Sequence, residues 1–215
     1  MMVDLVQSLS EERVVAVVRR MRESVFPAVL DALVSGGIRT IEVTMDGESA
    51  VEQIRLAKRR FGDKISVGAG TVMTTNQLHQ AHDAGAEFFV CPHLDVHLME
   101  ASQGLGTKMI PGVFTPSEIA AALRAGAEVV KIFPAGTLGA GYIRNILGPF
   151  HGLRIMATGG VSEKNMPEFF DAGVMAVGLG SNLFPKQDVD TNNWDAIRER
   201  AKEICALAKT SKSGG

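Results

Sequence analysis

One phrase recurs along the chain: a helical stretch ends in small residues with glycine, and an apolar strand follows within a few residues. It occurs as SGGIRTIEVT, AGAEFFVCP, AGAEVVKIFP and AGVMAVGLG. Glycine at a helix C-terminus tolerates the left-handed backbone that turns the chain into its next element. Short β-rich runs that alternate with helices are typical of a parallel α/β architecture.

Eight apolar runs of this kind can be counted. They span residues 14–19, 40–45, 66–71, 88–92, 108–113, 129–135, 155–160 and 176–181, and a helical stretch follows each. Eight βα units in 215 residues predict a single (β/α)8 TIM barrel. A doubly wound open sheet is the alternative, and it would more often show fewer strands and longer connections. We expect one domain over residues 1–209 and a flexible C-terminal tail over 210–215.

Two helix starts and one helix can be placed from local signals. Thr115 has the side chain of a helix cap, with Pro116 in the first turn and Glu118 three residues on. Ser162 is a similar cap candidate. The last helix, from about Trp194 to Lys209, is amphipathic.

The net charge limits which kinds of partner this protein can be expected to bind, and the cysteine content indicates the kind of cellular compartment. The formal net charge is −2 and the basic residues are spread along the chain, so neither nucleic acid nor an anionic membrane is expected as a partner. Two unpaired cysteines fit a reducing compartment. The first fifteen residues lack a basic region followed by an apolar stretch, and no signal peptide is predicted. We expect a cytoplasmic protein with a small-molecule substrate.

Two of the predicted strands contain a full charge, Glu42 in TIEVTM and Lys131 in VVKIFPA. Barrel strands are covered on both sides and should be mostly apolar. A charged side chain that points inward near the carboxyl end of a strand lies at the catalytic mouth of a TIM barrel.

The structural interpretation is a buried Lys131–Glu42 ion pair that braces the barrel. Burying such a pair costs several kcal/mol per ion, and such pairs are weak stabilisers. The functional interpretation assigns each residue a task. Among apolar neighbours the neutral amine of Lys131 is favoured, and it can attack a ketone to form a Schiff base. A nearby carboxylate can move the protons that this chemistry requires.

Glycine-rich turns follow the last two predicted strands. They read Thr158-Gly159-Gly160 and Gly178-Leu179-Gly180-Ser181. Many barrels bind phosphate here, because glycine lets the backbone N–H groups approach the anion closely. The alternative is that these glycines only make tight turns. A third glycine run, which ends at Thr71, places a hydroxyl where a substrate carboxylate or hydroxyl could meet it.

Two histidine pairs have spacings that would suit a metal on a helix face. They are His79 with His82, and His93 with His97, and we expect both in solvent-facing helical segments. Neither pair has an evident carboxylate partner at a strand end, so no metal site is predicted. Cys91 ends a strand and is expected to be a small buried hydrophobe.

The ordered motifs GGIRTIEVT, VGAGTV, IPGVFTPSE, VVKIFPAG, ATGGV and GLGS, between about Arg13 and Pro185, resemble one family. It is the 2-dehydro-3-deoxy-6-phosphogluconate (KDPG) and 4-hydroxy-2-oxoglutarate (KHG) aldolase family, class I lyases of the (β/α)8 type. The resemblance implies a lysine Schiff base with a 2-oxo acid, cleavage to pyruvate and an aldehyde, no metal or organic cofactor, and a homotrimer.

The resemblance also implies a role for individual residues. The Schiff-base lysine falls on Lys131 in KIFP, and the proton-shuttling glutamate falls on Glu42 in EVT. The substrate-binding positions fall on Thr71, Pro92, Phe133, Gly159, Gly160 and Ser181. We add Gly180, from the glycine turn after the last strand, and Arg19, for the reason given next.

One motif departs from the family. Well-known members read E-V-T-x-R, and that arginine meets the substrate carboxylate, whereas this chain has Asp46 at the position. Arg19, at the end of the first strand, is the expected replacement. Because of this departure, a related 2-keto-3-deoxy acid of the galactonate type is an alternative substrate. Two different functions also stay open for such a barrel: a sugar-phosphate isomerase or epimerase, and a non-catalytic protein that binds a phosphometabolite.

Overall fold

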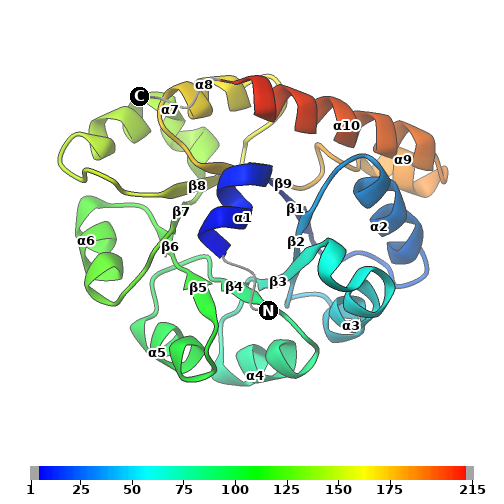
Figure 1. The fold of residues 1–215 in the computed structure, drawn as a ribbon, viewed down its shortest axis with the longest axis horizontal. Coiled ribbons are helices and arrows are strands. Elements are labelled where there is room, and N and C mark those ends of the chain that lie inside the picture. The colour runs from blue at the N-terminus through cyan, green and yellow to red at the C-terminus, as the bar shows by residue number, and fades with distance from the viewer. Residues whose placement is uncertain (1–4, 212–215) are drawn as a thin grey trace.

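A ring of parallel strands surrounded by helices makes up the computed structural model, which describes residues 5–211 (Figure 1). Each of the eight predicted runs contains strand, and every strand pair is parallel. The strands are β1 (Val14–Val18), β2 (Thr40–Thr44), β3 (Ser66–Gly70), β4 (Phe88–Val90), β5 (Lys108–Ile110), β6 (Gly112–Val113), β7 (Val130–Ile132), β8 (Ile155–Thr158) and β9 (Ala176–Leu179). The predicted barrel is confirmed.

The fifth predicted run is divided into β5 and β6 by Pro111. Proline has no N–H to donate to a strand ladder, but its carbonyl oxygen accepts a hydrogen bond from the Lys131 N–H at 2.8 Å. β5 pairs with β4, and β6 pairs with β7. The order of paired strands therefore begins at β5 and ends at β6, and these two strands are consecutive in the sequence. The ring therefore closes through Pro111, which excludes the doubly wound open sheet.

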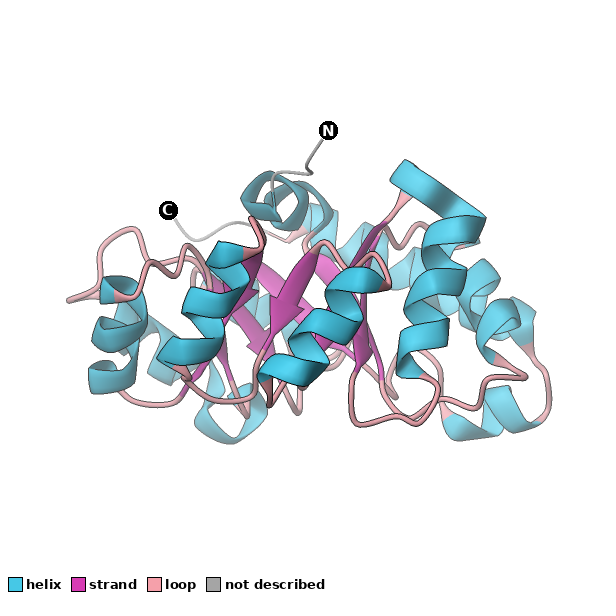
Figure 2. Ribbon diagram, turned by 90° about the horizontal axis from the view of Figure 1, so that it is seen from below, coloured by secondary structure: helices cyan, strands magenta, loops and turns pink. Residues whose placement is uncertain are grey.

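Helices cover the outside of the ring (Figures 1 and 2). They are α2 (Phe26–Ser35), α3 (Ala50–Phe61), α4 (Thr75–Asp83), α5 (Val96–Gly104), α6 (Pro116–Arg124), α7 (Ala135–Leu147), α8 (Met166–Asp171) and α10 (Trp194–Thr210), with a 3-10 turn η1 (Gly62–Lys64). None of the helices described over residues 5–211 has the length and apolar character needed to span a membrane.

The local signals for helix ends have mixed outcomes. Thr115 caps α6 with the reciprocal bonds of a capping box to Glu118, as predicted. The prediction for Ser162 is wrong: α8 begins at Met166, and the Ser162 N–H and hydroxyl donate to Oδ1 of Asn165. The N-cap position of α8 is therefore held by Asn165.

The last helix runs one residue past the predicted domain boundary. α10 ends at Thr210. The Arg13 guanidinium donates to the carbonyl oxygens of Ala208 and Ser211, at 2.8 and 2.7 Å. The rest of the predicted tail, residues 212–215, lies outside the described residues.

A helix that the sequence did not predict, α1 (Leu5–Glu12), lies across one opening of the ring (Figure 1). Its buried side chains join an apolar cluster inside the barrel. The cluster contains Leu5, Leu9, Val15, Phe88, Val90, Ile110, Val129, Met156 and Ala176. Because α1 covers the amino ends of the strands, access to the interior is left at their carboxyl ends.

Candidate active site

A cavity of about 1140 Å³ opens at the carboxyl ends of the strands. It is the largest of the three cavities described, the others measuring about 120 and 340 Å³. Its lining includes all ten predicted site residues: Arg19, Glu42, Thr71, Pro92, Lys131, Phe133, Gly159, Gly160, Gly180 and Ser181. These residues come from several different strands or the turns after them, and the barrel brings them together in one place.

Lys131 lies in the middle of β7, pairs in register with Gly112 and Met156, and is only 6% exposed. Its Nζ is 5.3 Å from the centroid of the Phe133 ring, which also lines the cavity. Lys131 therefore lines the cavity beside an aromatic ring.

Glu42 lies in the middle of β2 and is fully buried. Neither of its carboxyl oxygens has a hydrogen-bond partner among the described residues. Burial raises the pKa of Glu42, and the positive charges of Lys131 and Arg19 oppose this rise only in part. A carboxyl group with a raised pKa is suited to give and take a proton near neutral pH.

Two glycines of β3 make room inside the barrel. A β-carbon on Gly70 would overlap the carboxyl group of Glu42, and one on Gly68 would overlap the ring of Phe88. Residues two apart on a strand face the same side, so both glycines face the interior. Because Gly68 and Gly70 have no side chains, Glu42 and Phe88 occupy the space beside β3 inside the barrel.

The two glycine turns lie against each other at one side of the cavity. Gly159 and Gly160 have φ of +80° and +77°, a left-handed backbone that favours glycine. The turn after β9 is joined to the turn after β8 by Asn182, whose Nδ2 donates to the carbonyl oxygen of Val161 at 2.6 Å. Ser181 is exposed beside them. Flexible glycine backbone and a hydroxyl suit an anion.

Arg19 lines the cavity as predicted, but it is not free. Its guanidinium lies 3.0 Å from Oδ2 of Asp46, and Nε of Arg20 lies 2.9 Å from the same oxygen. The sequence showed Asp46 only as a departure from the family and did not indicate Arg20. Thr158 was not singled out as a site residue either, although it lines the cavity and its buried hydroxyl has no partner among the described residues.

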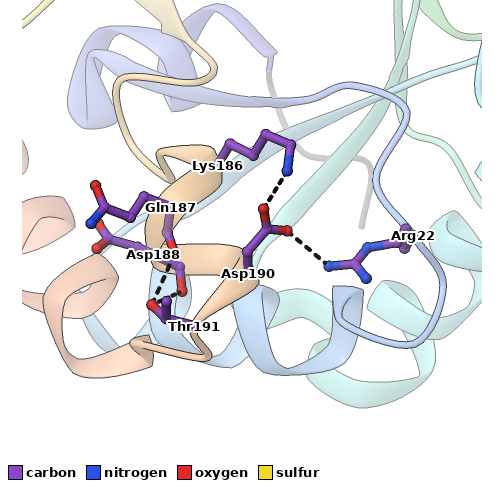
Figure 3. Close-up of polar contacts among 6 residues, drawn as sticks. All are labelled: Arg22, Lys186, Gln187, Asp188, Asp190 and Thr191. Atoms are coloured by element: carbon purple, nitrogen blue, oxygen red, sulfur yellow. Dashed lines mark hydrogen bonds and ion pairs between the residues drawn. The ribbon is translucent and has the colours of Figure 1, made fainter.

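A short helix, α9 (Lys186–Asp190), borders the cavity and was also not predicted. Asp190 connects it to the loop after β1, because its carboxylate pairs with Arg22 at 3.2 Å and also with Lys186 (Figure 3). Both cations are well exposed. This network lies at the rim of the cavity, since all three residues are part of its lining.

The histidine pairs do not form a metal centre within residues 5–211, where no group of three or more metal-ligand side chains comes together. His93 is not helical as predicted, because α5 begins only at Val96. Its Nδ1 lies 3.2 Å from the sulfur of Cys91. Cys91 is fully buried, and burial raises the pKa of its thiol.

The barrel fold and a buried lysine and carboxyl group at its catalytic mouth define a class of (β/α)8-barrel enzyme. Comparison with known proteins narrows that class. The model of the KDPG and KHG aldolase family matches residues 5–200. The chain belongs to this family, and it is therefore a lyase.

Individual relatives agree with the family match. A 2-dehydro-3-deoxy-phosphogluconate aldolase of Haemophilus influenzae is 32% identical over 95% of this chain and 97% of the relative. A probable 2-dehydro-3-deoxy-6-phosphogalactonate aldolase of Rhizobium meliloti is 34% identical over 81% of this chain and 82% of the relative. A solved KDPG aldolase of Legionella pneumophila, with pyruvate captured as a covalent carbinolamine, has a TM-score of 0.87 and 31% identity, and the match covers 93% of this chain and 97% of that one.

Proposed function

We propose that this enzyme cleaves KDPG to pyruvate and glyceraldehyde 3-phosphate, or 4-hydroxy-2-oxoglutarate to pyruvate and glyoxylate, through a Schiff base on Lys131. The observation that carries the proposal is the placement of Lys131 and Glu42 in one cavity, both buried and both inside the barrel. A purely structural ion pair between Lys131 and Glu42 would not explain the two glycine turns beside the cavity. It would also not explain why the carboxyl oxygens of Glu42 have no hydrogen-bond partner among the described residues. The Legionella pyruvate carbinolamine is the intermediate that the first step of this chemistry forms.

The first half of the reaction builds an electron sink. The Lys131 amine attacks the C2 ketone and gives a carbinolamine. The protonated carboxyl of Glu42 donates a proton to the C2 hydroxyl, which leaves as water, so an iminium forms. The raised pKa of Glu42 supports this role, because a neutral carboxyl group is available at the start.

The second half breaks the C3–C4 bond. The carboxylate of Glu42, directly or through a water, takes the proton of the C4 hydroxyl. The electron pair of the C3–C4 bond moves into the iminium, the aldehyde leaves, and an enamine remains. Protonation at C3 and hydrolysis release pyruvate and return the Lys131 amine. The iminium accepts the electrons, so we propose that no metal or organic cofactor takes part.

The other site residues bind the substrate in this proposal. The turns containing Gly159, Gly160, Gly180 and Ser181 hold the phosphate. Thr71, Pro92 and Phe133 enclose the pyruvyl part, and Arg19 binds its carboxylate. The support for this assignment is that all of these residues line the same cavity as Lys131.

A substrate panel scored by pyruvate release tests the proposal. It contains KDPG, its galactonate counterpart, their unphosphorylated forms and 4-hydroxy-2-oxoglutarate. We expect KDPG or 4-hydroxy-2-oxoglutarate to give the highest kcat/KM. The galactonate counterpart is the second candidate, supported by the Rhizobium relative. Ligand binding without pyruvate release from any compound would contradict lyase activity and favour a binding protein.

We also propose that the enzyme is a cytoplasmic homotrimer and that its chain forms one domain, whose last helix ends at Thr210 and not at the predicted boundary of residue 209. The family resemblance implies the trimer. Large apolar side chains exposed after three neighbouring strands, Met73, Val96 and Phe114, are suited to contact between subunits. Light scattering coupled to size exclusion measures the mass in solution, and a monomer would contradict the proposal.

A further inference from the structure

Asp46 lies between two consecutive arginines at the mouth of the cavity. A single oxygen, Oδ2, is 3.0 Å from the Arg19 guanidinium and 2.9 Å from Nε of Arg20. Asp46 follows β2, and the arginines follow β1, its neighbour in the barrel. All three residues line the cavity that contains Lys131.

The backbone at Arg20 accounts for the convergence of the two arginines. Consecutive side chains of an extended segment point to opposite sides, so one carboxylate would not reach both. Arg20 has φ of +47°, a left-handed conformation that non-glycine residues adopt at a cost. This turn of the backbone lets the side chains of Arg19 and Arg20 meet the same oxygen. Strain of this kind persists where surrounding interactions fix it, and here the ion pairs with Asp46 are such interactions.

The contact covers the carboxylate and leaves the arginines accessible. The side chain of Asp46 is 16% exposed, while those of Arg19 and Arg20 are 58% and 67% exposed. Burial raises the pKa of Asp46, but the nearby Thr44 side chain, the hydrogen bond from Arg19 and the charges of both arginines outweigh it and lower the pKa below its usual value. Asp46 is therefore ionised, and the group of three carries a net charge of +1, from two cations and one anion.

Each guanidinium has five N–H donors in a fixed plane. Asp46 occupies only part of them, through one oxygen. The remaining N–H donors of the two adjacent guanidinium groups can donate to the oxygens of one further carboxylate, and the net charge of +1 is opposite to the charge of that carboxylate.

We propose that Asp46 is a positioning residue that holds Arg19 and Arg20 together as the receptor for the carboxylate of a 2-oxo acid, with Arg20 as a second contact. The inference rests on the proposed function, because it takes the ligand of this cavity to be a 2-oxo acid. It assigns Asp46 a task that follows from its contacts: the aspartate serves binding through the arginines, although by itself it repels a carboxylate.

The competing interpretation predicts the opposite effect of one substitution. If Asp46 merely occupied the arginines in competition with the substrate, its removal would free them and tighten binding. If Asp46 positions them, its removal weakens binding. The sign of the change on Asp46→Ala therefore decides between the two.

The experiment measures the pyruvate concentration that gives half-maximal borohydride trapping on the full-length enzyme. We expect Asp46→Ala to raise this concentration about tenfold, as for a weakened charge-assisted contact, with the same trapped fraction at saturation. Asp46→Asn should raise it less, because an amide oxygen still accepts from arginine. Arg19→Ala and Arg20→Ala should each raise it, and Asp46→Ala should add little to the double arginine variant.

Methyl pyruvate separates carboxylate binding from a general loss of structure. It has the same ketone but no negative charge. The positioning variants should lose their preference for pyruvate over methyl pyruvate, and the trapping of methyl pyruvate should change little. Equal weakening for both compounds would mean that the variant disturbs the whole site, and it would overturn the proposal.

Arg22→Ala is the matched control, because it removes one positive charge from the same loop but from a side chain that pairs with Asp190 (Figure 3). An effect of Arg20→Ala no larger than that of Arg22→Ala would overturn the role of Arg20. Tighter or unchanged pyruvate binding in Asp46→Ala would overturn the role of Asp46. Absence of trapping on wild-type Lys131 would instead contradict the proposed function, so the two failures are distinguishable.

Discussion

The carboxyl group of Glu42 occupies the space that a β-carbon on residue 70 would fill. Thr44, two residues along β2 from Glu42, pairs in register with Gly70 of β3. The Glu42 side chain extends along the inside of the barrel toward the cavity and passes over Gly70, which has no side chain. The position of the proposed proton-transfer group is therefore set by a glycine on another strand.

Gly70→Ala should move Glu42 and lower turnover. The added methyl group overlaps the carboxyl group, so Glu42 has to leave its position. General acid–base catalysis contributes about 10²–10⁴-fold, and we expect a loss on the order of tenfold or more from misplacing the group. Steady-state kinetics give the loss, and thermal unfolding shows whether the fold is retained.

Gly68→Ala is the matched control on the same strand. Its methyl group meets the Phe88 ring in the apolar interior, and the three atoms nearest to it all belong to that ring. We expect overpacking to cost roughly 1–3 kcal/mol of stability, with a smaller loss of turnover in the folded protein. Equal kinetic losses in the two variants would show that the effect of Gly70→Ala comes from general strain in β3.

Lys131 should be the residue that borohydride traps with pyruvate. Peptide mass spectrometry should locate the adduct on Lys131, and trapping should inactivate the enzyme. Lys108 is the control, because it also lies in a strand but is paired with Glu128 and half-exposed at the other end of the barrel. Labelling at Lys108 or at any residue other than Lys131 would contradict the proposed mechanism.

The sequence predicted the barrel and the two buried charges of the site from two physical rules, whereas Arg19, Pro92 and Phe133 were assigned by the family resemblance. Parallel strands covered on both faces should be apolar, so the charged residues Glu42 and Lys131 in such strands indicated a functional site. The carboxyl ends of barrel strands meet at one mouth, so residues distant in sequence could be assigned to one cavity. Neither inference required knowledge of side-chain conformations.

Other features depended on contacts that the sequence does not contain. α1 is a single amphipathic stretch, and its packing across the barrel opening follows from the space left between the strands. α9 has only five residues, too few for a repeating apolar pattern with the helical period of 3.6 residues. The pairing of Asp46 with Arg19 and Arg20 depends on the left-handed backbone at Arg20, which no local residue preference indicated.

Glu42→Gln should leave the protein folded and slow its turnover. Glutamine has the same shape but does not exchange a proton, so we expect turnover to fall on the order of 10²-fold or more. Single-turnover measurements of pyruvate formation separate this loss from changes in product release. Turnover close to that of the wild type would assign proton transfer to another group or to water.

The same substitution should change how stability depends on pH. The pKa of Glu42 is raised by burial in the folded protein, and in the unfolded chain it is about 4.3. Between these two values the folded protein binds more protons than the unfolded chain, so its free energy of unfolding falls as pH rises. Above the raised pKa this loss is complete, and below about pH 4.3 it is absent.

Glu42→Gln has no proton to lose, so this part of the pH dependence should disappear. We expect the variant to become progressively more stable relative to the wild type as pH rises through that window. Urea unfolding midpoints for both proteins, measured across the pH range, give the difference. A relative stability that falls with rising pH would mean that Lys131 and Arg19 lower the pKa of Glu42 and that burial does not dominate.

Ser181→Asp should weaken binding of phosphorylated substrates selectively. Ser181 lies next to Gly180 in the turn after β9, exposed and part of the cavity lining. A carboxylate there repels a phosphate held by the glycine turns, so KM for KDPG should rise while KM for its unphosphorylated form stays nearly constant. Ser181→Ala controls for loss of the hydroxyl and should raise KM for KDPG less. If Ser181→Asp raises both KM values equally, the glycine turns do not bind the phosphate, and the charge acts on the shared 2-oxo acid end of the substrate.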